Sequence, residues 1–527
     1  MITEENSSNN NSINDSLQKL MKGTGLIIIS ILLSSIFIFA RTVLIARAWS
    51  EYYVGIFSVG LTVLNICMTA SSLGMTEGVV RSIAHSKGKN EFDKIPKFIV
   101  TSVLLSFFVS VIAGLIVFFL SEIISVNIFH EESLILPLKI IAISIPFNVV
   151  NIKIVSIFRG FEQIKPMAYI KNILESLLFL VFILIIIALN LPFVYVFHAF
   201  LLTSIIIFII LTIYSFKKST SFSFFSIKSI FSPAAKELIM FSLPLLGTAM
   251  IGLIITWTDT IMIGTIKGAS EVGLYHAVVP FAVFIFFPLS ALLVSYVPIF
   301  SGLYAKGLLN EMRSNYLILT KWITIFSLPL FIIFFLFPEL PIKVLLGDNY
   351  LDSVNVLRIL SLAQIINNLV GPCGASLIVL GKTRFNLYTT ITAATLNVIL
   401  NLLLIPIYSY NGAAIASAST IIFINIVKTV KLYSISKIQP LSSNLIKPIV
   451  FSLLFIIPIY YILTQIFLIY NWWFLIFILI LLYIVYLLSV LFTKSLDRND
   501  INMLLEIENK TGFKFKRFKK FLSKFTN

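Results

Sequence analysis

Residues 98–120 read FIVTSVLLSFFVSVIAGLIVFFL, a run without a single charged side chain. A helix of about 20 apolar residues spans the roughly 30 Å hydrocarbon core of a bilayer, so this run predicts a transmembrane helix. Fourteen apolar runs of similar length follow one another between residues 23 and 493, among them span 1 (23–46), span 2 (54–76), span 7 (238–266), span 8 (272–299) and span 10 (353–380). The composition agrees, with 58% hydrophobic residues, 12% charged residues and a mean hydropathy of +1.01. The sequence therefore predicts an all-α polytopic membrane protein with about 14 transmembrane helices.

The segments that join these runs alternate between basic and nearly uncharged. All but seven of the 39 Lys and Arg residues fall on one side of this alternation. Four lie on the other side, at Arg47, Lys139, Lys267 and Lys343. Lys and Arg are retained on the cytoplasmic face during insertion, so the pattern predicts that the N- and C-termini are both cytoplasmic and that the number of spans is even. A multi-pass protein of the cell membrane is expected.

The chain also contains an internal repeat. Residues 41–57, RTVLIARAWSEYYVGIF, align without gaps on residues 259–275, DTIMIGTIKGASEVGLY, so that Gly55 matches Gly273. A repeat of six spans has an even count, and both copies enter the membrane from the same side. The copies are then related by a two-fold axis along the membrane normal, as parallel transporter repeats are.

This repeat predicts the domain organisation. Residues 1–22 form a polar, irregular cytoplasmic arm, residues 23–236 an N-lobe of spans 1–6, and residues 237–440 a C-lobe of spans 7–12. Residues 441–494 add spans 13 and 14, and residues 495–527 form a basic cytoplasmic tail. Phenylalanines recur at helical spacing in this tail, which fits either an amphipathic helix on an anionic leaflet or a solvated basic tail.

Ionisable side chains inside a bilayer cost at least about 2.5–3.5 kcal/mol each on insertion scales, so those that are present usually face a cavity or a partner. The predicted spans contain three cations and two anions: Arg41, Lys153, Glu175, Asp259 and Arg358. No acid lies within the first four predicted spans. This balance favours a transported group that is anionic.

Arg41 and Asp259 occupy equivalent positions of the repeat. Arg41 lies about 18 residues, or roughly 27 Å, along span 1 and hence in its outer half. Its guanidinium offers a planar fork of donors that suits a phosphate or diphosphate, and the alternative is that it snorkels to the outer interface. Asp259 can pair with Arg41, carry a coupling proton or cation such as Na⁺, or cap a kinked helix.

The other intramembrane charges lie closer to the ends of their spans. Lys153 and Arg358 either face a cavity, and are then substrate-binding candidates, or reach the interface. Glu175 follows Lys171 by one helical turn, and this pair is interpreted as structural.

Polar and helix-bending residues give further candidates. Amides gather in the second lobe at Gln364, Asn367, Asn397 and Asn401. They either form hydrogen bonds between helices or contact the hydroxyl groups of a sugar. Prolines within spans 7 and 8, at positions 244, 280 and 288, predict kinks. The histidines at positions 198 and 276 are interpreted as buried residues with satisfied hydrogen bonds.

Several stretches resemble a known family. They are residues 41–57, 73–89, 241–264, 271–281 and 380–390. Together they look like the polysaccharide-export branch of the multidrug/oligosaccharidyl-lipid/polysaccharide exporter superfamily, which contains flippases for lipid-linked oligosaccharides. The resemblance implies two six-helix bundles around a central cavity and transport by alternating access. It also implies that Arg41, which matches the family's cation, faces the cavity and meets a lipid-linked pyrophosphate.

Three function classes follow. The first is a flippase for a polyprenyl- or dolichyl-(pyro)phosphate-linked oligosaccharide, and the second is a small-molecule antiporter that exports drug cations. The third, a membrane glycosyltransferase or polymerase, is disfavoured because the longest external segments, residues 121–134 and 338–352, lack a catalytic arrangement of carboxylates. Two cysteines and four histidines predict neither a metal site nor a disulfide framework, and no cofactor or nucleic-acid partner is expected. The expected assembly is a monomer in contact with membrane lipids.

Overall fold

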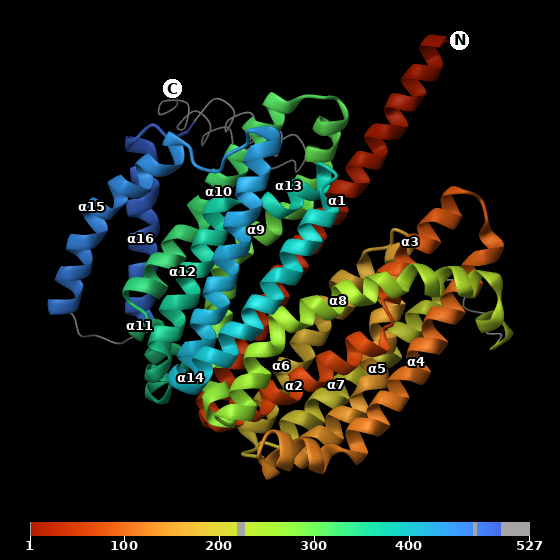
Figure 1. The fold of residues 1–527 in the computed structure, drawn as a ribbon, viewed down its shortest axis with the longest axis horizontal. Helices are drawn as coiled ribbons and strands as arrows, with labels where there is room; N and C mark the ends of the chain where they lie inside the picture. The colour runs from red at the N-terminus through yellow and green to blue at the C-terminus, as the bar shows by residue number, and fades with distance from the viewer. Residues whose placement is uncertain (1, 219–226, 467–471, 497–527) are drawn as a thin grey trace. The chain divides into compact units, whose positions relative to one another are not determined.

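The computed structural model describes residues 2–218, 227–466 and 472–496 (Figure 1). The secondary structure of these residues is helical. Its main helices are, in chain order, α1 (Ile2–Ala48), α2 (Glu51–Ser71), α3 (Met75–Gly88), α4 (Ile95–Phe119), α5 (Ile135–Gly160), α6 (Glu175–Ala188), α7 (Tyr195–Lys218), α8 (Pro233–Ile266), α9 (Ala269–Ala305), α10 (Leu309–Leu336), α11 (Glu339–Pro341), α12 (Val354–Val370), α13 (Cys373–Val379), α14 (Thr383–Ser436), α15 (Ser443–Ile466) and α16 (Trp472–Phe492).

The described residues contain 13 helical stretches that are long and apolar enough to cross a membrane. One of them, α14, has 54 residues and would measure about 80 Å if it were straight, far more than a bilayer requires. Its backbone leaves the helical conformation at Ser409, with φ 51° and ψ −135°. This break divides α14 into two spans, and the total then agrees with the predicted 14.

Two other spans are broken where the sequence predicts continuous helices. Span 2 divides into α2 and α3 at Leu73 and Gly74, which have φ values of 51° and 69°. Span 10 divides into α12 and α13 at Gly371, with φ 73°, before a proline. The stretch that contains α2 and α3 has 38 residues and runs on to Gly88, so Glu77 lies in it just beyond the predicted end of span 2. The expectation that the first four spans hold no acid stays a prediction.

The N-terminal residues differ from the predicted irregular arm. α1 begins at Ile2, so the residues predicted as an irregular arm form the first part of the span 1 helix. A helix extends one residue at a time at little cost once a stable segment exists, and span 1 provides that segment. Residues 497–527, with the predicted basic helix, lie outside the described residues.

The chain forms two compact units, which are described separately. Unit 1 contains residues 1–25, 278–393 and 414–527, and unit 2 contains residues 26–277 and 394–413. These bounds pass through α9 and α14 and differ from the lobe boundaries predicted from the repeat. The boundaries of the lobes, of spans 13 and 14 and of the terminal segments stay predictions.

In unit 2, α5 is the central helix and packs against α2, α3, α4 and α7. The side chains of Ile141, Ile145 and Ile157 on α5 are fully or almost fully buried. Two of its amides bond to α7, because Asn148 donates to Ser204 Oγ at 2.9 Å and Asn151 donates to the Ser204 carbonyl oxygen at 3.1 Å. A helix with apolar side chains on most of its surface is stable in the middle of a bundle, which explains the position of α5.

The repeat has a direct counterpart in unit 2. A Cβ atom added at Gly55 would lie 1.7 Å from the carbonyl oxygen of Ala269, and one added at Gly273 would lie 1.8 Å from that of Glu51. The first turns of α2 and α9 therefore touch through their backbones at both glycines. Reciprocal contacts between equivalent residues are what a two-fold axis produces where it passes between them.

In unit 1, α10 packs against α12, α15 and α16, and α15 and α16 lie side by side (Figure 1). Buried aromatic side chains, among them Tyr296, Phe300 and Tyr316, form a core with Leu377 and Leu432. The carbonyl group of Val370, which the break in span 10 frees from its helix, accepts a hydrogen bond of 2.5 Å from the Tyr316 hydroxyl. An unsatisfied carbonyl would be costly in the membrane, so this bond stabilises the break.

Candidate functional site

The side chain of Arg41 lies on the face of α1 that contacts α6 and the π-helical turn before it. Asn172 donates to Ser30 Oγ at 2.9 Å, and the hydroxyl groups of Ser34 and Ser176 are 2.8 Å apart. Residues 30, 34 and 41 share one side of a helix because seven residues make about two turns. These contacts fix the side of α1 from which Arg41 projects.

The guanidinium group of Arg41 packs against two aromatic rings. Its central carbon lies 5.4 Å from the ring centre of Phe57 on α2 and 5.0 Å from that of Phe179 on α6. Each such contact contributes up to about 2 kcal/mol where water is excluded, which offsets part of the cost of burying the charge. Arg41 Nε is buried and has no hydrogen-bond partner among the described residues. The two phenylalanine rings have no hydrogen-bond donor. A phosphate bound at this place would therefore accept its hydrogen bonds from the N–H groups of Arg41.

Asp259 forms a buried polar cluster with Tyr275, Asn397 and Asn401, here named the Asp259 cluster. The Tyr275 hydroxyl donates to Asp259 Oδ2 at 2.6 Å, and Asn401 Nδ2 donates to Oδ1 at 2.7 Å. Asn401 Nδ2 also lies 3.2 Å from Asn397 Oδ1. The Asp259 side chain is only 4% exposed, and both asparagines are fully buried. The cluster therefore joins α8, α9 and α14 within unit 2.

A second polar contact lies beside this cluster. Thr260 Oγ1 is 2.5 Å from His276 Nε2, and the His276 ring stacks on Trp257. His276 Nε2 thus has a hydrogen-bond partner, as predicted, while the side chain is half-buried and not fully buried. The sequence interpretation did not include Tyr275 in the site. Part of the signal was available, because residues equidistant from the turn of a helical hairpin lie at about the same level along the two helices, and Asp259 and Tyr275 are so placed.

Arg41 and Asp259 thus have different partners. The Arg41 guanidinium contacts two aromatic rings, whereas the Asp259 carboxylate accepts hydrogen bonds from a phenol and an amide. Asn401 Oδ1 is buried without a hydrogen-bond partner among the described residues. A buried carboxylate beside a free amide oxygen is an arrangement that can take up a proton or a small cation.

Lys153 lies at the break between α2 and α3 and is fully buried. Its ammonium group donates to the carbonyl oxygen of Ser72 at 2.9 Å and to Thr76 Oγ1 at 3.1 Å. Nearby, Arg159 forms a bidentate pair with Glu77, at 2.9 and 3.3 Å. Lys153 therefore supports an interrupted helix, and this placement gives no support to its predicted contact with substrate.

The remaining predicted residues lie in unit 1. Arg358 Nη2 donates to Glu339 Oε1 at 2.8 Å, near one end of its span, so its charge is paired. Asn367 Oδ1 accepts a hydrogen bond of 2.9 Å from Asn425 Nδ2, while Gln364 is half-buried on α12. The predicted amides thus fall into two groups, one of which belongs to the Asp259 cluster.

Two further expectations concern pairing and metals. Lys171 and Glu175 lie 2.6 Å apart, as predicted for a structural pair. Cys67 and Cys373 are free thiols. In the described part of the chain, no group of three or more His, Cys, Asp or Glu side chains is placed to hold a metal ion.

Comparison with known proteins identifies the family. Residues 20–304 match the profile of the family described as "Polysaccharide biosynthesis protein", and residues 244–403 match the profile described as "MatE". An uncharacterized membrane protein of Methanocaldococcus jannaschii, MJ1068, is 24% identical over 76% of this chain and 81% of its own length.

Two solved structures share the fold. The lipid II flippase MurJ, in an inward closed conformation, superposes with a TM-score of 0.68 at 18% identity and covers 88% of this chain and 97% of its own. An inward-facing multidrug resistance MATE family transporter has a TM-score of 0.63 at 16% identity, over 77% and 96% of the two chains. These likenesses confirm the predicted fold class. The chain belongs to the polysaccharide biosynthesis protein family and is a membrane transporter of the multidrug/oligosaccharidyl-lipid/polysaccharide superfamily, not an enzyme.

Proposed function

We propose that this protein is a flippase that carries a lipid-linked oligosaccharide from the cytoplasmic to the outer leaflet of the cell membrane. The observation that carries the proposal is Arg41, a cation within span 1 that contacts two aromatic rings and has an unpartnered Nε among the described residues. A polyprenyl or dolichyl carrier bears a phosphate or pyrophosphate, and a guanidinium binds such groups through two parallel hydrogen bonds. Membership in a polysaccharide biosynthesis family supports this substrate class.

In this proposal the two predicted lobes move so that the substrate site is open first to one side of the membrane and then to the other. Arg41 holds the phosphate, amide side chains such as those of Gln364 and Asn367 contact the sugar hydroxyl groups, and the lipid chain stays in the bilayer. The termini are cytoplasmic, as the distribution of Lys and Arg predicts, and the protein acts as a monomer.

We further propose that the Asp259 cluster couples transport to a proton or Na⁺ gradient. In Asp259→Asn, the shape is kept, because Asn401 Nδ2 can still donate to the oxygen of the new amide and the new Nδ2 can donate to the Tyr275 hydroxyl oxygen. The fold should therefore survive while the charge is lost. We expect gradient-driven flipping to fall by at least about tenfold, because a neutral amide does not take up a proton and lacks the negative charge that attracts Na⁺. Flipping rates in proteoliposomes with and without an imposed pH or Na⁺ gradient measure this.

Asp348→Asn serves as the matched control, because Asp348 is 69% exposed and pairs with Lys343 outside the cluster. We expect it to transport as the unmodified protein does. If Asp259→Asn keeps the gradient dependence of the unmodified protein, the coupling role is wrong.

The flippase function itself is tested in cells and in vitro. Deletion of the gene should cause lipid-linked oligosaccharide to accumulate while the surface glycan disappears. Purified protein in vesicles should move a labelled polyprenyl diphosphate-linked oligosaccharide from the inner to the outer leaflet. Unchanged surface glycan together with raised sensitivity to cationic dyes would instead establish the antiporter.

A further inference from the structure

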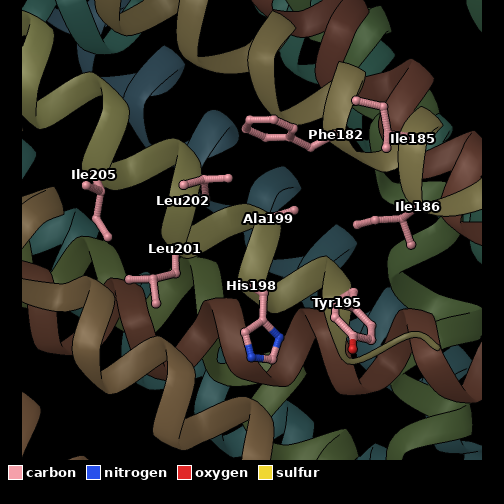
Figure 2. Close-up of a pocket in the computed structure, with 9 residues that line it drawn as sticks. All are labelled: Phe182, Ile185, Ile186, Tyr195, His198, Ala199, Leu201, Leu202 and Ile205. Carbon is pink, nitrogen blue, oxygen red and sulfur yellow. The ribbon is translucent and has the colours of Figure 1, made fainter. Parts of the chain in front are cut away.

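A shallow apolar groove runs between α6 and α7 in unit 2, with a volume of about 420 Å³ (Figure 2). Its walls come from Phe182 and Ile185 on α6 and from Leu202 and Ile205 on α7. This volume lies within the range of roughly 300–1,000 Å³ that is usual for small-molecule sites.

The groove opens at the surface of unit 2. Ile185 and Leu202 on its walls are 46% and 47% exposed, whereas Ile186 and Ala199 on its floor are buried. All four belong to stretches that are long and apolar enough to cross the membrane, Pro166–Ala188 and Tyr195–Lys218. An apolar hollow at this depth is filled by hydrocarbon, because water gains no hydrogen bonds there.

One end of the groove is polar. Tyr195 and His198 lie there, on the first turn of α7, with their ring centres 5.5 Å apart (Figure 2). His198 Nδ1 donates to the carbonyl oxygen of Val194 at 3.2 Å, which leaves Nε2 to accept a hydrogen bond in the neutral ring or to donate one to an anion in the protonated ring. The interpretation of His198 as a buried residue is wrong, because its side chain is exposed. A tyrosine and a histidine at the end of a span are placed at the level of lipid head groups.

We infer that this groove binds a membrane phospholipid, with one hydrocarbon chain between α6 and α7 and the phosphate beside Tyr195 and His198. The apolar walls match the chain, and the Tyr195 hydroxyl can donate a hydrogen bond to a phosphate oxygen. The predicted orientation puts this end of α7 in the outer leaflet. The inference does not depend on the transported substrate.

Photolabelling tests the site. The full-length protein is placed in phosphatidylcholine nanodiscs that contain a trace of phosphatidylglycerol with a photoactivatable chain, and labelled peptides are identified by mass spectrometry. We expect labels on residues 182–205. Leu202→Trp fills the groove and should reduce this labelling by about tenfold, because the chain loses most of its buried contacts. Ile209→Trp is the matched control, since Ile209 on the same helix is 48% exposed and does not line the groove.

The head group is tested with a second probe. The double variant Tyr195→Phe and His198→Ala should weaken labelling by the phospholipid but leave labelling by a diacylglycerol with the same photoactivatable chain unchanged. Equal loss of label in Leu202→Trp and Ile209→Trp would overturn the inference, as would labelling spread evenly over the spans. Displacement of the probe by polyprenyl diphosphate at a lower concentration than by phospholipid would also overturn it, because the occupant would then be the carrier lipid.

Discussion

In Arg41→Ala, flipping of the lipid-linked oligosaccharide is expected to fall by at least about 100-fold. A hydrogen bond to a charged group contributes about 1.5–3 kcal/mol, and a bidentate contact with a phosphate has two of them. Their loss corresponds to roughly 10²–10⁴ in rate or affinity, at about 1.4 kcal/mol for each factor of ten. The variant should still fold, because Phe57 and Phe179 lose a cation but keep their apolar neighbours.

Arg41→Lys tests whether the positive charge alone is enough or whether the planar guanidinium is needed. An ammonium keeps the positive charge but offers no planar fork, so about a tenth of the activity of the unmodified protein should remain. Arg47→Ala, six residues along the same helix and exposed, is the control and should leave transport unchanged. Flipping rates in vesicles and restoration of surface glycan in a deletion strain measure both effects. Full transport in Arg41→Ala and Arg41→Lys would exclude a phosphate-binding role for Arg41.

The second large effect is expected at the contact between α2 and α9. A methyl group in Gly55→Ala or Gly273→Ala would lie within 2 Å of a carbonyl oxygen of the other helix, so the two backbones must separate. Overpacking of this kind typically costs about 1–3 kcal/mol. We expect a lower melting temperature and at least about a tenfold loss of transport in either variant, because both substitutions force apart the same pair of helices.

Two comparisons make this prediction specific. The double variant should cost less than the sum of the single variants, because the second methyl group enters a gap that the first has opened. Gly252→Ala in α8 is the control, since an added Cβ there meets no atom within 4 Å. Melting curves and flipping rates measure these effects. Melting temperatures that match the unmodified protein in Gly55→Ala and Gly273→Ala would show that the helices do not meet in this way.

Much of the fold could be predicted from sequence because each span is a local property. A segment of about 20 apolar residues enters the bilayer whatever its neighbours are, so the number of spans follows from composition. The breaks in spans 2 and 10 could not be predicted in this way. Each depends on a distant donor, Lys153 for the carbonyl of Ser72 and Tyr316 for that of Val370. A break in the membrane is stable only when another helix supplies such a donor.

For the candidate site too, the residues could be predicted from the sequence but their contacts could not. Arg41, Asp259, Asn397 and Asn401 could be found from sequence, because a polar side chain in an apolar run is conspicuous and costly. The contacts that these side chains make could not be predicted from the sequence. Asn397 and Asn401 join Asp259, while Asn367 pairs with Asn425 in unit 1.

The sequence by itself determined that this chain crosses the membrane many times, that it is built from a repeat, and that few polar side chains lie inside the bilayer. Only the tertiary structure decided that Arg41 packs against Phe57 and Phe179, and that Asp259 is held by Tyr275 and Asn401. The physical reason is the range of the forces involved. Partition into a bilayer depends on the composition of one segment, whereas the partner of a buried charge depends on which helices pack together.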